Sequence, residues 1–256
     1  MKKIYLIAAM AACTLAASAQ QALSLSTVGG TNLDKYDGQE CRISANRYVF
    51  TGWNTIALPF SLTEAELNEL FGADCRLERL VAAEAEGNAV RLDFVDCKAE
   101  GMDASVPYIL HYAGAPKSVR IAKTATVSAA EATLSVVAKG SGEIITMTAA
   151  QHQTSSEGLY GVLAVANEEA TFVRMTDDKK IFYATRCYIE RQGDTELKTN
   201  HIKGITSGIE GVCAETDLVD VYTLGGARVA TGIRASEVGQ LPADIYVVGG
   251  QKILVK

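Results

Sequence analysis

The chain has 256 residues, with 24 Lys and Arg against 30 Asp and Glu, and a formal net charge of −6 at pH 7. Proteins of about 150 to 300 residues bury roughly 70% or more of the surface of the unfolded chain, so this length allows a substantial hydrophobic core. The acidic residues are spread along the chain and no basic stripe interrupts them, which argues against a nucleic-acid partner.

Residues 1–19 have the three parts of a secretory signal peptide. Lys2 and Lys3 give a basic start, an apolar stretch runs from Ile4 to Leu15, and Ala17-Ser18-Ala19 is a small-residue cleavage site. We therefore expect an exported protein, extracellular or on the outer-membrane surface, with the periplasm as the alternative. No later apolar run approaches the roughly 18 to 20 residues of a membrane-spanning helix, so we expect no transmembrane helix.

The cysteines do not form the pattern of a disulfide framework. Cys13 follows Ala11-Ala12 in the apolar run of the leader and is an alternative lipid-attachment site, with which the A-x-A cleavage site competes. The five cysteines after the leader are widely and irregularly spaced, and their odd number leaves at least one thiol free or paired between chains. These five are Cys41, Cys75, Cys97, Cys187 and Cys213.

After the leader, Gly and turn residues at intervals of roughly 8 to 15 residues separate segments rich in β-branched and aromatic residues, which is typical of many short strands. In residues 89–94, Val90, Leu92 and Phe94 alternate with Arg91 and Asp93, as in an antiparallel sheet with one buried and one wet face. We expect an all-β, mainly antiparallel, sandwich-like domain over residues 20–206, with the Ala-rich stretches 82–85 and 129–132 as loops. The expected strands are 47–50, 55–58, 89–94, 108–112, 118–122, 133–138, 143–149, 170–175 and 180–190.

One segment has the sequence signals of a helix. Thr63 can cap the first turn, Glu66 completes a capping box, and Gly72 supplies a left-handed end. The spacing predicts one two-turn helix over residues 64–71. The side chains expected to face the core are Leu67, Leu70 and Phe71.

The composition changes near residue 207, and residues 207–256 read as a small separate β module. Gly225-Gly226 and Gly249-Gly250 each lie between two strand-like segments, where a tight hairpin turn would use positive φ angles. Three blocks then appear in order: V-D-V-Y-T-L-G-G-A-R-V from Val219, L-P-A-D-I-Y-V-V from Leu241, and K-I-L-V-K at the end.

These three blocks resemble the type IX secretion C-terminal sorting domain of Bacteroidota. Two features differ from that family: Asp244 stands where Gly is usual, and the module is shorter than most sorting domains. The resemblance implies recognition by a secretion machinery, passage across the outer membrane, and release or surface attachment. The motif residues are Val221, Tyr222, Gly226, Leu241, Tyr246, Lys252 and Lys256.

The centre of the chain resembles a second element of secreted proteins from the same bacteria. The matching blocks are W-N-T-I-A-L-P-F at residues 53–60 and V-P-Y-I-L at 106–110, and residues 158–161 and 186–189 are similar to later blocks. This resemblance implies fold and location, and no activity. Trp53 is most simply a core anchor, and the alternative is a rim platform in which it stacks on sugar rings with Tyr48, Tyr108 or Tyr112.

The sequence offers no evident catalytic group. No H-E-x-x-H or C-x-x-C pattern occurs, so we expect no metal and no cofactor. The residues Gly140-Ser141-Gly142 lack the strand-to-helix elbow of a serine nucleophile. Glycoside cleavage needs two carboxyls about 5 to 10 Å apart, for which Asp93 with Asp96, or Asp177 with Asp178 in a polar turn, are candidates. The histidines, each isolated, are His111, His152 and His201.

The sequence thus predicts an exported, non-catalytic β protein that binds a glycan or a host or surface protein, as in adhesion. One alternative is a carbohydrate-active hydrolase with carboxylates that the sequence does not identify. The other is a structural component of a surface assembly, which would self-associate or exchange strands.

Overall fold

The computed structural model confirms the all-β fold, with one α-helix in the part of the chain that it describes. The leader with Cys13, residue Cys213, the expected domain boundary at 207, the pair Asp177-Asp178 and His152 lie outside that part. The described residues are 20–25, 31–150, 154–163, 170–176, 181–182, 185–204, 218–248 and 251–255.

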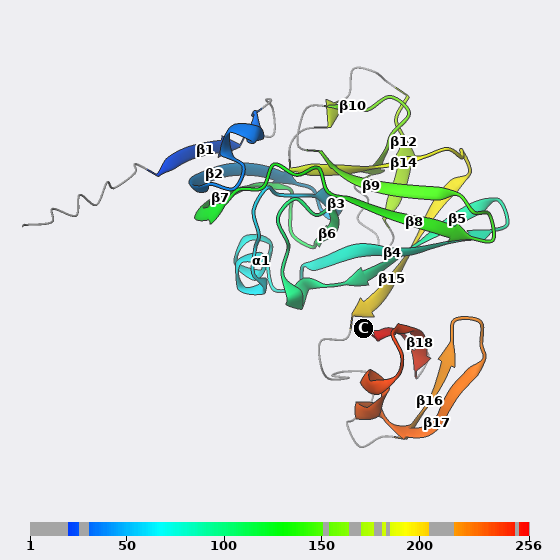
Figure 1. Cartoon of the computed structure of the whole chain (residues 1–256). Helices are drawn as coiled ribbons and strands as arrows, with labels where there is room; N and C mark the ends of the chain where they lie inside the picture. Colours follow the sequence, from blue (N-terminus) through cyan, green and yellow to red (C-terminus); the bar gives the residue numbers. More distant parts are fainter. Residues whose placement is uncertain are drawn as a thin grey trace, which may run out of the picture.

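A three-stranded sheet forms one layer of the body, at the left of Figure 1. It consists of β1 (Gln21–Leu25), β2 (Glu40–Val49) and β7 (Lys117–Thr126), with β2 in the centre. β2 pairs with β7 in antiparallel register and with β1 in parallel register. Residues alternate along β2, so one face of the sheet is buried and the other faces solvent.

The next layer is the antiparallel pair of β3 (Gly52–Ile56) and β6 (Tyr108–Tyr112). All five residues of β3 are buried, because both faces of this pair are covered. Ile56 and Leu110 belong to the core shared with the three-stranded sheet, whereas Trp53 and Ile109 belong to the core shared with the large sheet. The W-N-T block therefore lies between two hydrophobic cores.

The helix α1 (Glu64–Phe71) has the predicted bounds and the predicted capping box. The Thr63 hydroxyl accepts from the Glu66 amide, and the Glu66 carboxylate accepts from the Thr63 amide. Leu67 and Phe71 are buried in the core of the three-stranded sheet, and Leu70 is partly buried against it. The helix lies beside β7, one of the two edge strands of that sheet (Figure 1).

The large sheet has fourteen strands and continues into the C-terminal module. Its path is β12-β11-β14-β9-β8-β4-β5-β15-β19-β18-β16-β17, with β3 and β6 attached at β4, and the short strands β10 and β13 pair apart from it. The strands of the body are β4 (Arg76–Glu86), β5 (Ala89–Asp96), β8 (Thr133–Lys139), β9 (Ile144–Ala150), β10 (Thr154–Ser155), β11 (Tyr160–Leu163), β12 (Thr171–Arg174), β13 (Ile181–Phe182), β14 (Arg186–Arg191) and β15 (Glu196–Gly204).

Several strands were not in the sequence-based prediction: β1, the first part of β2, β4, β10, β11 and β15. Residues 82–85 are not a loop but the middle of β4, paired with β5 on one side and, at Ala83 and Glu84, with β8 on the other. Alanine has a low β propensity, which the packing of Ala83 against the core of the large sheet overrides. β15 was not predicted, because its run of Lys, Thr, Asn and His lacks the apolar alternation of a strand.

The module contains β16 (Leu218–Thr223), β17 (Arg228–Arg234), β18 (Asp244–Val248) and β19 (Gln251–Val255), at the bottom of Figure 1. It has its own core, in which the motif residues Val221 and Tyr246 are buried and Leu241 packs against them. It meets the body where β15 pairs with β19 in parallel over two residue pairs and where Ile245 packs with Val95 and Ile202.

The first hairpin of the module differs in detail from the prediction. The Thr223 carbonyl accepts from the Gly226 amide, and the Thr223 amide donates to the Ala227 carbonyl, so the loop is longer than two residues. Of the two glycines only Gly226 has a positive φ, +80°. Tyr222 is partly exposed, while the side chain of Lys252 and the whole of Lys256 lie outside the described part.

Candidate functional site

The three residues proposed from sequence for ligand stacking lie in the interior. Trp53 is 0% exposed, Tyr108 is 1% exposed and Tyr112 is 6% exposed. The Tyr108 hydroxyl accepts a hydrogen bond from the Asp103 amide at 3.2 Å, and Lys117 lies over the Tyr112 ring. Buried rings cannot stack on a sugar, so the rim platform centred on Trp53 is not formed, and these residues are core anchors.

Trp53 contacts two histidines that are far apart in the sequence, together with an arginine. The His201 ring stacks on the indole with centroids 4.4 Å apart and planes 8° apart, and His111 meets the indole edge-on at 5.1 Å. The Arg76 guanidinium lies 4.9 Å from the ring centroid. Nδ1 of His201 lies 2.5 Å from Oε2 of Glu78, a carboxylate that is only 2% exposed.

Glu78, His201 and Thr199 lie in the order of the carboxylate, imidazole and hydroxyl of a hydrolase triad, but their hydrogen bonds connect strands of the fold. The Thr199 hydroxyl lies 3.4 Å from Nε2 of His201, which continues the line from Glu78 through the imidazole. The same hydroxyl donates to the Ala170 carbonyl at 2.9 Å, so its proton does not point at the imidazole. The Trp53 ring also covers one face of His201. The cluster therefore ties β4 to β15 beneath the core.

Glu78 makes the stability of the protein depend on pH. Burial raises the pKa of Glu78, and the hydrogen bond to His201 opposes that rise only in part. Between the ordinary and the raised pKa the folded state binds more protons than the unfolded state, so the free energy of unfolding decreases as pH rises through this window. The Glu78→Gln variant should lack this decrease, since an amide does not titrate but can still accept from His201.

Chemical denaturation of wild type and Glu78→Gln, from about pH 4 to 8, measures the difference at each pH. We expect the free energy of unfolding of Glu78→Gln, relative to that of wild type, to increase as pH rises. Glu69→Gln, at an exposed position on α1, is the control. Parallel curves for wild type and Glu78→Gln would contradict the assignment.

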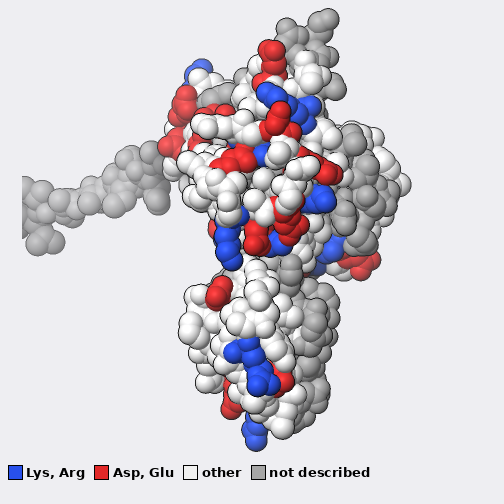
Figure 2. Space-filling model, turned by 90° about the vertical axis from the view of Figure 1, so that its right-hand side faces the viewer, with Lys and Arg blue, Asp and Glu red and all other residues white. Residues whose placement is uncertain are grey.

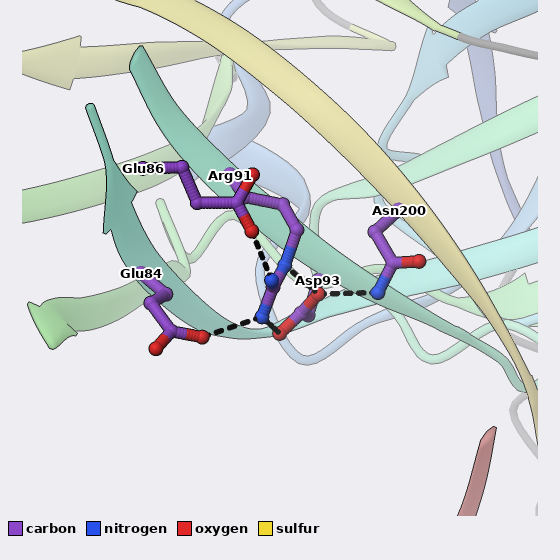
Figure 3. Close-up of polar contacts among 5 residues, drawn as sticks. All are labelled: Glu84, Glu86, Arg91, Asp93 and Asn200. Atoms are coloured by element: carbon purple, nitrogen blue, oxygen red, sulfur yellow. Dashed lines mark hydrogen bonds and ion pairs between the residues drawn. The ribbon is translucent and has the colours of Figure 1, made fainter. Parts of the chain in front are cut away.

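A second polar cluster is centred on Arg91 of β5 (Figure 3). Arg91 pairs with Glu84 on β4 at 2.7 Å, with Glu86, and with Asp93 at 2.9 Å, while the Asn200 amide on β15 donates to Asp93 at 2.5 Å. These carboxylates raise the pKa of Arg91 against the opposing effect of burial.

The Arg91 cluster corrects two expectations about β5. Asp93 is 1% exposed, so the face predicted to be wet carries a buried carboxylate. Asp93 and Asp96 do not form a carboxylate pair: they are three residues apart on one strand and face opposite sides, and Asp96 accepts from the Lys98 amide. Asp93 is saturated by Arg91 and Asn200, which fits a role in holding β5 to β15.

Acidic and basic side chains are interleaved on the face of the body seen in Figure 2, and the module below it shows few charges. Within the described ranges, no group of three or more His, Cys, Asp and Glu side chains is placed to hold a metal ion. No helix in those ranges is long and apolar enough to cross a membrane. The four described cysteines are buried and form no disulfide with one another, and burial raises the pKa of the Cys187 thiol to about 12.

The outer face of β2 carries an exposed aromatic pair. Tyr48 is 39% exposed and Phe50, just beyond the strand, is 43% exposed, and their rings meet edge-to-face with centroids 5.0 Å apart. Among aromatic side chains that the structure describes, only these two fall in the exposed class. We call the surface formed by Asn46, Tyr48, Phe50, Ser118 and Arg120 the aromatic face.

Buried polar side chains fix the backbone that carries the two rings. The Asn54 side chain accepts from the Phe50 amide and donates to the Phe50 carbonyl, both at 2.9 Å. The guanidinium of Arg47, 0% exposed, donates to the carbonyls of Tyr48 at 2.8 Å and Thr55 at 2.5 Å. The Asn54 side chain and the Arg47 guanidinium therefore hydrogen-bond the backbone on both sides of the turn between β2 and β3.

The strand register completes the aromatic face. Tyr48 lies opposite Ser118 and Asn46 lies opposite Arg120 on β7. The side chains of these four residues make no hydrogen bond or ion pair with the described residues, in contrast to the saturated Arg91 and Asp93. The polar groups of this face are therefore available to a ligand.

A hollow adjoins the aromatic face at the edge of β7, between that strand and α1. Its volume is about 240 Å³, slightly below the roughly 300 Å³ at which ligand pockets usually begin. Arg120 belongs both to the aromatic face and to the hollow. The lining residues are Leu62, Glu66, Glu69, Leu70, Arg120, Ile121, Ala122 and Lys123.

Comparison with models of known protein families, with characterised proteins and with solved structures finds no match to this chain. The site is therefore argued from its own geometry. Sequence reasoning named Tyr48 only as a partner of Trp53 and missed Phe50. The available signal was the alternation from Cys41 to Val49, which places Tyr48 opposite in phase to the core residues.

Proposed function

We propose that this is an exported, non-catalytic protein that binds glycans through the aromatic face, on the outer-membrane surface or after release. The observation that carries the proposal is the pair Tyr48 and Phe50, exposed by 39% and 43% and held on a fixed backbone. An exposed ring is an apolar surface that gains free energy when the C–H face of a sugar covers it. Rings that are already ordered lose little conformational entropy on binding.

The signal-peptide pattern and the resemblance of the module to a sorting domain support the location. Val221 and Tyr246 of the resembling blocks contribute to the core of the module, so the blocks specify a folded unit. We propose that the secretion machinery recognises this unit and that the body carries the glycan-binding function. Cys13 as a lipid-attachment residue, and the periplasm as the final location, are the alternatives to release.

Two other functions have weaker support. A hydrolase would need two carboxyls facing an open site, whereas Asp93 is buried and bound by Arg91, and Glu78 is buried and bound by His201. A structural role in a surface assembly is favoured by β17, an edge strand with mostly exposed residues on both faces. That role predicts self-association, which a measurement of the size of the chain in solution would detect.

The test is a glycan array followed by titration calorimetry with the chain from Gln20 to Lys256. Replacing Tyr48 or Phe50 by alanine should weaken binding of the best glycan at least about tenfold, as for an exposed anchor at the centre of a binding surface. Val137→Ala, which removes another exposed side chain on β8, should leave the affinity unchanged. Array signals at background level, or unchanged affinity in both aromatic variants, would refute the proposal.

A further inference from the structure

We infer that the ligand of the aromatic face is an anionic glycan and that Arg120 binds its carboxylate or sulfate group. This inference rests on the proposed function, and it adds the chemical class of the sugar. It is carried by the position, the charge and the unpaired state of Arg120.

The register places Arg120 next to the rings. Tyr48 lies directly opposite Ser118, and Arg120 lies opposite Asn46, so Tyr48 and Arg120 are diagonal neighbours on one face. Diagonal neighbours in an antiparallel pair are about 7 to 8 Å apart. This separation is close to the distance from the centre of a stacked sugar ring to a partner of its acidic substituent. A sugar on Tyr48 would therefore present a carboxylate to the guanidinium, which can bind it with two hydrogen bonds.

The charge on this sheet face is opposite to that of the whole protein. Its charged residues are Arg42, Arg120 and Glu40, while the net charge of the chain is −6. Glu40 lies eight positions along β2 from Tyr48, at the far end of the strand, and accepts from the Gln20 side chain at 2.9 Å. Close to the rings, the charge of the face is positive, which complements an anion.

The other two cationic side chains near this edge, Lys117 and Lys123, already have interaction partners. The Lys123 ammonium pairs with Glu66 at 2.5 Å and donates to the Ser61 carbonyl, and the Lys117 ammonium lies over the Tyr112 ring. Arg120 alone among these three makes no hydrogen bond, ion pair or ring contact with the described residues. It is also the residue through which the face continues into the hollow.

The hollow suggests how the glycan runs. Ser118 and Ala122 are four residues apart on β7, about 13 Å at the rise of a strand, which is the length of two to three sugar units. The apolar side chains of Leu62, Leu70 and Ala122 line the hollow, and Glu69 adds a negative charge there. An uncharged sugar unit would therefore occupy the hollow, and the acidic unit would lie on the Tyr48 side of Arg120.

The experiment compares matched ligands by titration calorimetry at low salt. The pairs are oligogalacturonate with its methyl ester, and a sulfated galactan oligosaccharide with its desulfated parent. Wild type should bind at least one acidic member about tenfold or more tightly than its neutral partner. The Arg120→Gln variant should reduce this preference to about threefold or less, with little change for the neutral ligand. Arg174→Gln, which alters an exposed arginine on β12, should retain the preference.

The outcomes of this experiment distinguish the role of Arg120 in binding an anionic sugar from the proposed glycan binding itself. A preference in the galacturonate pair identifies a carboxylate ligand, and a preference in the sulfated pair identifies a sulfate ligand; either supports the inference if Arg120→Gln abolishes it. Equal affinity for acidic and neutral ligands, lost in Tyr48→Ala, overturns the anionic ligand and keeps the proposed function. A preference that Arg120→Gln leaves intact overturns the role of Arg120. Absence of binding to every glycan overturns the proposed function itself.

Discussion

Replacement of Trp53 by alanine is expected to lower the free energy of unfolding by about 3 to 5 kcal/mol, the range for large aromatic side chains deleted from a core. Trp53 is fully buried, stacks on His201 and lies against His111 and Arg76. The substitution would also remove the ring that stacks on His201, the hydrogen-bond partner of the buried Glu78 carboxylate. The lost packing would weaken the strand pair β3 and β6, whose residues belong to both hydrophobic cores.

Urea unfolding measures this loss, with Trp53→Phe and Phe50→Ala as matched variants. Trp53→Phe keeps a ring beside His201 and should cost less than half as much. Phe50→Ala removes an exposed ring and should change the free energy of unfolding by about 0.5 kcal/mol or less. If Trp53→Ala unfolds at the wild-type urea concentration, the indole is not the anchor that the structure indicates.

Replacement of Glu143 by glutamine is expected to destabilise the protein by about 3 kcal/mol, near the lower end of the cost of breaking a buried ion pair. Glu143 accepts from Nε and Nη2 of Arg191, both at 2.7 Å, and from the Gly193 amide at 2.8 Å. The Arg191 side chain is 0% exposed and that of Glu143 is 15% exposed. The amide would leave the charge of Arg191 buried without a carboxylate.

The same pair gives a pH dependence opposite in sign to that of Glu78. The Arg191 hydrogen bond, followed by the Gly193 amide, outweighs burial and lowers the pKa of Glu143. Its stabilisation is present above the ordinary pKa of a glutamate and is lost as pH falls through the lowered pKa. Denaturation curves at several acidic pH values should therefore converge for wild type and Glu143→Gln. A loss equal to that of Glu190→Gln, an exposed acid on β14, would contradict this account.

Local sequence patterns predicted the parts of the fold that local chemistry determines. The capping box at Thr63 and Glu66 and the stop at Gly72 satisfy backbone groups within one turn, so the helix bounds could be predicted. Most strands could be predicted from alternation. The Ala-rich part of β4 and the polar β15 could not, because their strand conformation also depends on partners distant in sequence: Ala83 and Glu84 pair with β8, and β15 pairs with β5.

The candidate site could be predicted only in part, for the same reason. The alternation in β2 separates Tyr48 from the buried Val49 and Ala45, so an exposed ring was within reach of the sequence. Arg47 breaks the rule that inward positions are apolar, since its charge is held by two backbone carbonyls. The approach of Arg120 to Tyr48 depends on the register of β2 with β7, which no local pattern specifies.

The central claim, that the aromatic face is the glycan-binding site, is tested most directly by backbone amide NMR of the chain during titration with oligogalacturonate or the best array glycan. We predict that the amides of residues 46–50 and 118–120 shift first, followed by those that line the hollow. The indole N–H of Trp53, the single tryptophan, should not shift, because its ring is buried. Shifts confined to Arg91, Asp93 and Asn200, or to Trp53 and His201, would place the ligand elsewhere and contradict the account.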